Sequence, residues 1–423
     1  MKVLIALLMV FGAVAGAKAQ VAPEGITPRK LSISGTLTYS ARYSQMANFY
    51  NGSNGQQASI SGDFGYSTTS ERAPFAITIG AGDSWTISGA TYNSGPYETL
   101  SVSQGIVGEH GSLQLSDSLG YHQGSPVTGF TGETGSGQPI SQPNPPTDAS
   151  ILTLNTTMIN NDATAEYSYK FSGFTTVSAG GAWNVLRYLN GNGLDTDSLS
   201  ANLAWTRRLD ARDSLVARYA FSQYSYPDAS IAIDINTPTA GWQRTWTRTV
   251  SSSVSVGPQW VNSSGSGLAS SATINPALIQ VPSSSGVSAS ASVSDKTRFG
   301  QASLAYDHGV MGGGGYTYGG EMDDVTGSFS RQFGRQIGSQ TTMELTGGYR
   351  RTDSLDSLEG NYITKYGSAQ ITRSLGRQFS VFAGYTGSVQ SSSTQVSANV
   401  LNGLWQVVSF GIGFTPPQIH LRH

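Results

Sequence analysis

An aromatic and basic row lies in residues 242–248, whose sequence is WQRTWTR. Successive residues of an extended strand face opposite sides, so Trp242, Arg244 and Trp246 would share one face. Indole rings stack on sugar rings, and a guanidinium group binds hydroxyls, carboxylates or phosphates through paired hydrogen bonds. If this face lines a channel, the row predicts a track that guides a saccharide.

A second candidate site consists of two pairs of ionisable residues on either side of a Gly-rich loop. Asp307 and His308 precede the loop, and Asp323 and Asp324 follow it. Carboxylate and imidazole groups can do general acid–base chemistry. Asp–Asp and Asp–His pairs at a barrel rim resemble those of the omptin surface proteases, which would imply a rim hydrolase. The simpler interpretation is that Asp and His favour loops, because Asp side chains cap turns. We keep the hydrolase as an alternative and expect no enzyme.

Cofactor and nucleic-acid motifs are absent from the sequence. It contains no phosphate-binding loop, no CxxC and no HExxH, and it has no cysteine. None of the five histidines has a partner at metal-ligand spacing. The formal net charge of −2 gives no reason to expect nucleic-acid binding. We therefore predict no cofactor, no metal and no nucleic-acid partner.

The elements that would position these side chains are long two-faced strands. In residues 31–43 every odd position is apolar, aromatic or Gly, and every even position is Ser, Thr or Arg. The same alternation recurs from residue 163 onward. Thirteen residues exceed a typical globular strand of about 5–6 but suit a tilted membrane strand. Only 12% of residues are charged, against about 25% in ordinary domains. The pattern predicts an all-β, transmembrane, antiparallel up-and-down β-barrel.

A repeated Arg-bearing turn sets the strand count. Arg207 and Arg248 are 41 residues apart, and Arg331 and Arg373 are 42 apart, which is one hairpin per period. Short turns in bacterial barrels face the periplasm and long loops face outward, so we place these four arginines in periplasmic turns. Eight such turns and nine outer connections predict about eighteen strands. Sixteen is the runner-up, because residues 74–120 are difficult to assign.

The ends and the longest loop complete the predicted organisation. Lys2, an apolar run and the cleavage pattern of residues 17–19 indicate a secretory signal peptide, so we expect export to the outer membrane. A Pro- and Gly-rich loop over 121–161 either folds into the lumen or extends outside. The predicted segments are a signal peptide at 1–19, a short periplasmic segment at 20–30, the barrel at 31–415 and a C-terminal tail at 416–423.

Strand parity gives expectations for five side chains. Arg42 and Arg218 alternate with apolar neighbours and should face the lumen, where they either contact a solute or pair with acids. Arginine on the lipid face costs about 2–4 kcal/mol at the bilayer midplane, so Arg244 should also face the lumen, with Trp242 and Trp246. The alternative is that the tryptophans belong to the interfacial girdle. Arg248 is then expected to reach the periplasm, as its turn position favours.

The C-terminal half resembles a known family of barrels. The sequences that carry the resemblance are GGGG at 312–315, DVTGSFSRQF at 324–333 and SFGIGF at 409–414. Over roughly residues 160–415 the chain is similar to β-barrel porins found beside exopolysaccharide export systems in Gram-negative bacteria. The resemblance implies a link to exopolysaccharide export. One departure is that the chain continues beyond Phe414, whereas many such barrels end on an aromatic residue.

These observations favour a porin-like channel for small hydrophilic solutes or saccharides, because unplugged barrels of this size enclose water. The alternative is a structural or adhesive barrel without an open pore, which long Ser- and Gly-rich loops would also suit. Expected partners are outer-membrane lipid, the barrel assembly machinery and a small hydrophilic solute or saccharide. No face of the predicted barrel is marked as an oligomer contact.

Overall fold

The structure of the chain is a computed structural model. It describes residues 35–50, 53–68, 70–90, 95–123, 157–189, 193–265, 267–268, 278–279, 281–312, 317–334, 339–355, 360–393 and 402–421. The predicted signal peptide at 1–19, the segment at 20–30 and most of the predicted loop at 121–161 lie outside the described residues.

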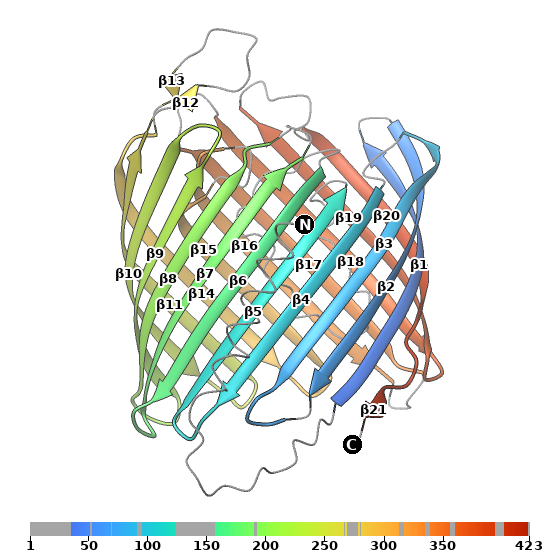
Figure 1. Ribbon diagram of the computed structural model, residues 1–423, viewed down its shortest axis with the longest axis horizontal. Coiled ribbons are helices and arrows are strands. Elements are labelled where there is room, and N and C mark those ends of the chain that lie inside the picture. The colour runs from blue at the N-terminus through green and yellow to red at the C-terminus, as the bar shows by residue number, and fades with distance from the viewer. Residues whose placement is uncertain are drawn as a thin grey trace, which may run out of the picture.

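Eighteen long antiparallel strands form one closed barrel (Figure 1). Each strand pairs with its neighbours in chain order, and β1 closes the circle by pairing with both β2 and β20. The strands are β1 (Gly35–Tyr50), β2 (Ser53–Thr68), β3 (Phe75–Gly89), β4 (Gly95–Val107), β5 (Gly111–Gln123), β6 (Thr157–Lys170), β7 (Thr175–Tyr188), β8 (Thr196–Arg208), β9 (Asp213–Tyr226), β10 (Ile231–Thr245), β11 (Val250–Ser264), β14 (Ser284–Lys296), β15 (Gly300–Met311), β16 (Gly320–Phe333), β17 (Thr341–Ser354), β18 (Asn361–Leu375), β19 (Phe379–Ser392) and β20 (Gly403–Phe414). The predicted eighteen-stranded barrel is confirmed.

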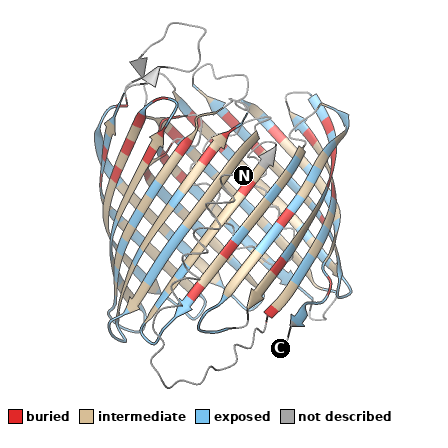
Figure 2. Ribbon diagram, in the orientation of Figure 1, coloured by how far each residue is buried: buried red, intermediate tan, exposed pale blue. Residues whose placement is uncertain are grey.

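The wall has an apolar outer face and a polar inner face. In β7 and β8, Trp183 lies opposite Leu199, and both side chains are about half exposed on the outside. Residues that are directly opposite in an antiparallel pair point to the same side, so the register carries this assignment from strand to strand. Figure 2 shows the resulting alternation of exposed and less exposed positions along the strands. Apart from a bulge between Gln56 and Gln57 in the β2–β3 pair, the inner and outer residues of each strand follow from this parity.

The two ends of the barrel have different connections. Eight turns of three to seven residues join the strands at one end, and nine connections, most of them longer, join them at the other. Three of the short turns contain the same pair of side-chain-to-backbone hydrogen bonds. The side-chain oxygens of Ser172, Asp210 and Thr247 each accept hydrogen bonds from the backbone N–H groups two and three residues further on. Such side chains favour turns because they satisfy backbone donors locally.

Three shorter strands lie outside this pattern. β12 (Gly267–Leu268) and β13 (Leu278–Ile279) pair within the β11–β14 connection. β21 (Ile419–Leu421) lies in the predicted tail and pairs with Gly35–Leu37 at the start of β1. β20 pairs with β1 only from Ala41 onward, so β21 covers backbone groups that would otherwise form an open strand edge. Part of the tail therefore belongs to the sheet. No helix in the described part of the chain is long and apolar enough to span a membrane.

Candidate functional site

The inner wall carries rows of hydroxyl groups. Between β11 and β14, Ser251 meets Ser294, Ser253 meets Ser292 and Ser255 meets Ser290 across the strands, at Oγ–Oγ distances of 2.7–2.9 Å. Similar pairs join Ser44 to Ser59, Ser116 to Thr164 and Ser303 to Ser328, each at 2.6 Å. Hydroxyls both donate and accept hydrogen bonds, so this surface can exchange partners with water or with a polyhydroxylated solute.

An acidic and basic cluster interrupts the hydroxyl surface on β15–β17. Asp324 and Arg350 lie opposite each other on the inner face, and the Arg350 Nη2–Asp324 Oδ2 distance is 3.1 Å. Their side chains are only 11% and 15% exposed. Asp307 of β15 lies opposite Asp324 and is exposed on the inner face. The cluster thus combines a buried ion pair with a carboxylate that can contact a solute.

Arg42 lies on the inner face of β1, and its guanidinium carbon is 3.7 Å from the ring centroid of Phe382 on β19. β20 runs between these strands and presents Gly411 and Gly413 at this level, where a Cβ on Gly411 would overlap the Phe382 ring. The two glycines let side chains from non-adjacent strands stack. Cation–π stacking fixes the guanidinium plane against the wall.

Arg218 lies on the inner face of β9, between Ala204 of β8 and Thr239 of β10, and is exposed there. Its neighbours are small, so its guanidinium can extend from the wall. Arg42 and Arg218 therefore both occupy inner positions. They do not share a binding surface, because seven strands separate β1 from β9.

The aromatic and basic row of β10 lies on the outer face, which contradicts its predicted place in the lumen. Trp242 is opposite Leu215 of β9 and Val254 of β11, and both of those side chains point outward. Arg244 shares the parity of Trp242, and Trp246 follows the strand with its ring 48% exposed. The energetic objection to an outer arginine does not apply here, because Arg244 is at the barrel end, 3.8 Å from Asp213 Oδ1 and 4.5 Å from the Trp246 ring.

Of the four arginines predicted in short turns, the structure places one in a turn. Arg248 lies in the turn after β10, whereas Arg207, Arg331 and Arg373 are within three residues of the strand ends and point outward. The strands are longer than the sequence pattern indicated, so that residues assigned to turns still pair. All four nevertheless lie at the short-turn end.

The acidic pairs of the alternative hydrolase site are divided between the two faces of the wall. Asp307 and Asp324 point inward, whereas His308 and Asp323 point outward, where His308 Nδ1 and Asp323 Oδ1 are 2.9 Å apart. Adjacent residues of a strand must face opposite sides, so consecutive residues cannot line one cleft here. The arrangement contradicts the idea that the four groups form a common rim site.

A segment of the β15–β16 connection folds inward over the wall at the long-connection end. Thr317 and Tyr318 are almost fully buried, and the Tyr318 ring meets Tyr226 edge-on at 5.1 Å. Tyr318 belongs to an apolar cluster with Ile231, Ile233 and other inner residues of β9–β11. Gln259 of β11 strengthens this packing, because its side chain exchanges hydrogen bonds with the backbone of Val310 at 2.7 and 3.2 Å. No periodic signal in the sequence indicates this contact.

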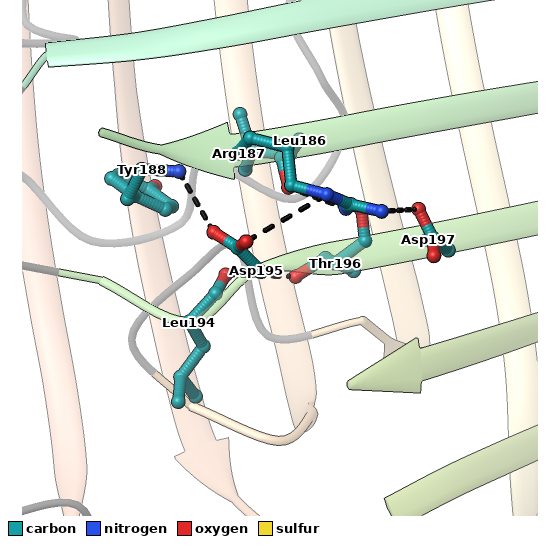
Figure 3. A network of polar contacts seen from close by, with 7 residues as sticks. All are labelled: Leu186, Arg187, Tyr188, Leu194, Asp195, Thr196 and Asp197. Atoms are coloured by element: carbon teal, nitrogen blue, oxygen red, sulfur yellow. Dashed lines mark hydrogen bonds and ion pairs between the residues drawn. The ribbon is translucent and has the colours of Figure 1, made fainter. Parts of the chain in front are cut away.

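At the same end, an outer ion-pair network fixes the β7–β8 connection. Arg187 Nη2 lies 2.6 Å from Asp197 Oδ1, and Arg187 Nε lies 3.7 Å from Asp195 Oδ2 (Figure 3). Asp195 also accepts a hydrogen bond from the Tyr188 backbone N–H at 2.8 Å. These contacts hold the connection close to the ends of its two strands.

Comparison with known proteins gives fold likenesses only. No protein-family model matches the chain. No curated protein sequence matches it either. Among solved structures, OccAB3 of Acinetobacter baumannii aligns at 8% identity and a TM-score of 0.45, over 91% of this chain and 99% of that one. OccK2 (OpdF) of Pseudomonas aeruginosa in complex with glucuronate aligns at 10% identity and a TM-score of 0.45, over 92% of this chain and 98% of that one. A bacterial polysaccharide outer membrane secretin aligns at 8% identity and a TM-score of 0.37, over 89% of this chain and 97% of that one. These scores add nothing to what the strand registers establish.

Proposed function

We propose that this chain is an outer-membrane channel that passes small hydrophilic solutes. The observation that carries the proposal is the closed eighteen-stranded wall, apolar outside and lined with hydroxyls inside. A closed barrel leaves no strand edge unpaired, which is the condition for β-structure to span a bilayer. Barrels of about 16–18 strands enclose an aqueous channel unless a domain fills them. The predicted signal peptide supports export.

The orientation of the barrel is part of the proposal. Bacterial barrels have short turns on the periplasmic side and longer loops outside, so the eight short turns would face the periplasm. Outer-membrane lipid would contact the apolar belt, and the barrel assembly machinery would insert the chain.

Saccharides are the class of solute to test first. The hydroxyl rows and the exposed Asp307 and Arg218 offer hydrogen-bond donors and acceptors suited to sugar hydroxyls. The resemblance of residues 160–415 to porins beside exopolysaccharide export systems points to the same class. The outer row at Trp242 and Arg244 has no part in this proposal, because it does not face the lumen.

One observation favours a second candidate, a structural barrel without an open pore. The inward-folded Thr317 and Tyr318 and the apolar cluster beneath them occupy part of the mouth. The mature chain, refolded in detergent and added to a planar bilayer, distinguishes the two. Stepwise single-channel currents are expected of a pore, and liposome swelling should then rank sugars by size. Insertion without any current would reject the pore and leave the structural role.

A further inference from the structure

A concentration of positive charge surrounds the short-turn end. The eight short turns, with three strand residues on each side, contain twelve described Lys or Arg and five described Asp or Glu, a net charge of +7. We use the name basic collar for nine of these residues, which lie on the outer face or in the turns. They are Arg72, Arg207, Arg212, Arg244, Arg248, Arg298, Arg331, Arg373 and Arg377.

Exposed aromatic rings hold several of these guanidinium groups in place. The guanidinium carbon of Arg331 is 5.2 Å from the Phe333 ring, that of Arg298 is 5.4 Å from Phe299, and that of Arg244 is 4.5 Å from Trp246. All three rings are more than 40% exposed. A guanidinium that stacks through its face keeps its N–H edge directed away from the ring, where it can bind an oxyanion through two hydrogen bonds.

The acids of the described chain compensate the basic collar only in part. Among the described residues, the ion pair found within it joins Arg244 to Asp213 at 3.8 Å. At the opposite end, the equivalent regions contain one described base, Arg187, and five described acids, a net charge of −4. Arg187 is paired with two of those acids. Within the described chain, an excess of arginine over acid is therefore confined to one end of the barrel.

The position of the basic collar indicates its ligand. Aromatic girdles lie at the membrane–water interface, at the level of the lipid head groups, and three of the nine arginines, Arg244, Arg298 and Arg331, stack on exposed aromatic rings at this end of the barrel. Basic side chains at this level attract anionic lipids. We propose that the basic collar binds the phosphate groups of anionic phospholipids in the leaflet around the short-turn end. The proposal rests on the membrane location of the barrel, and it holds whether or not the pore is open.

Quenching of tryptophan fluorescence by brominated lipid tests the proposal, because Trp205, Trp242 and Trp246 lie beside the basic collar. The full mature chain is reconstituted in phosphatidylcholine that contains increasing fractions of brominated phosphatidylglycerol, and then in the reverse mixture. The wild-type protein should prefer phosphatidylglycerol. In the variant Arg207→Gln/Arg331→Gln/Arg373→Gln the preference should fall by at least about fivefold, which is the factor that a single basic group near an anionic surface contributes.

Two further variants separate lipid binding from damage to the fold. Arg207→Lys/Arg331→Lys/Arg373→Lys retains the charge and should retain most of the preference. The control Lys365→Gln removes an outer charge distant from the basic collar, and should leave the phosphatidylglycerol preference unchanged. Heat-modifiable migration in gels checks that each barrel is folded. A wild-type protein with equal affinity for both lipids would overturn the proposal.

Soluble phosphate distinguishes a lipid site from a general anion site. Excess inorganic phosphate should leave the phosphatidylglycerol preference largely intact, because many head groups bind at once while each free anion binds alone. Complete loss of the preference in phosphate would overturn lipid binding in favour of a free-anion site. The conductance experiment is independent of this outcome, so failure of the channel proposal and failure of the lipid proposal are distinguishable.

Discussion

The two ends of the barrel differ in charge, in connections and in what their connections contact. The short-turn end has a net charge of +7 over its described turns and flanking residues, whereas the long-connection end has −4. Arginines stack on exposed outer rings at the first. At the second, Tyr318 packs inward against Tyr226 on the wall. Under the two proposals made above, the short-turn end contacts the membrane boundary and the long-connection end shapes the entrance to the channel.

The polar interactions on the inner wall also differ between the two ends. The buried Asp324–Arg350 pair and the exposed Asp307 lie nearer the long-connection end of their strands, below the inward-folded segment. Arg42 and Phe382 stack closer to the short-turn end. Each arrangement depends on strands being held in one register, because the partners come from different strands.

The largest expected effect comes from Arg350→Met. The substitution leaves the carboxylate of Asp324 buried without its cation, next to Asp307, and removal of one partner of a buried ion pair costs about 3–5 kcal/mol. Urea unfolding of the detergent-solubilised protein, followed by tryptophan fluorescence, measures this loss. Because the substitution also removes positive charge from the inner wall, the channel should become more selective for cations.

The matched control is the double variant Arg350→Met/Asp324→Leu. Replacement of both charges by apolar groups of similar volume is often neutral, so most of the lost stability should return. If the single variant were as stable as the wild type, the long-connection end would not depend on internal ion pairing, and the contrast between the ends would be one of surface charge alone.

The next effect in size is that of Tyr318→Ala on the inward-folded segment. Truncation of the buried ring removes its packing on Tyr226 and on the apolar cluster, which weakens docking of the segment by up to about 3 kcal/mol. The strand ladder does not involve this ring, so global unfolding should change little. Single-channel conductance should rise, because a loosely docked segment covers less of the mouth.

The outer aromatic Trp183→Ala is a matched control for that variant. It removes a ring of comparable size from the outer face of β7, where no inner packing is lost. Its conductance should stay at the wild-type value. If Tyr318→Ala also left the conductance unchanged, the inward-folded segment would not restrict the entrance, and the ends would not differ in this respect.

Much of this fold could be predicted from the sequence, because the period-2 pattern is set by backbone geometry at every strand. The strand number followed from the hairpin period between arginines such as Arg331 and Arg373. The face of the β10 row could not be predicted in the same way. Trp242 and Arg244 alternate with Gln243 and Thr245, so neither face is clearly apolar, and only the register with Leu215 and Val254 decides the side.

The internal contacts could not be predicted from the sequence either, but for a different reason. Asp324 and Arg350 meet across two strands whose register is fixed by the whole barrel, and the sequence offered Asp324 only as a member of an acidic pair. The contact of Tyr318 with Tyr226 joins segments 92 residues apart through a connection that has no period. Periodicity predicts which face a residue occupies, and it does not predict which distant residue folds onto that face.

The smallest expected effect concerns the turn at Asp210, at the short-turn end. Backbone N–H groups of Arg212 and Asp213 donate to Asp210 Oδ1 at 2.6 and 2.8 Å, and these hydrogen bonds lower the pKa of the Asp210 carboxyl below its usual value. The stabilisation is thus fully present above the ordinary pKa of Asp, near 3.8, and is lost as the pH falls through the lowered pKa. Acid should loosen this turn.

Amide hydrogen exchange at Arg212 and Asp213, referenced to unstructured peptides at each pH, measures that loosening. The turns of Ser172 and Thr247 are internal controls, because hydroxyl oxygens make the same pair of hydrogen bonds and do not titrate in this range. Asp210→Asn keeps an acceptor oxygen and should remove the pH dependence. Equal protection of all three turns from neutral to acid pH would show that the Asp210 carboxylate adds nothing to its turn.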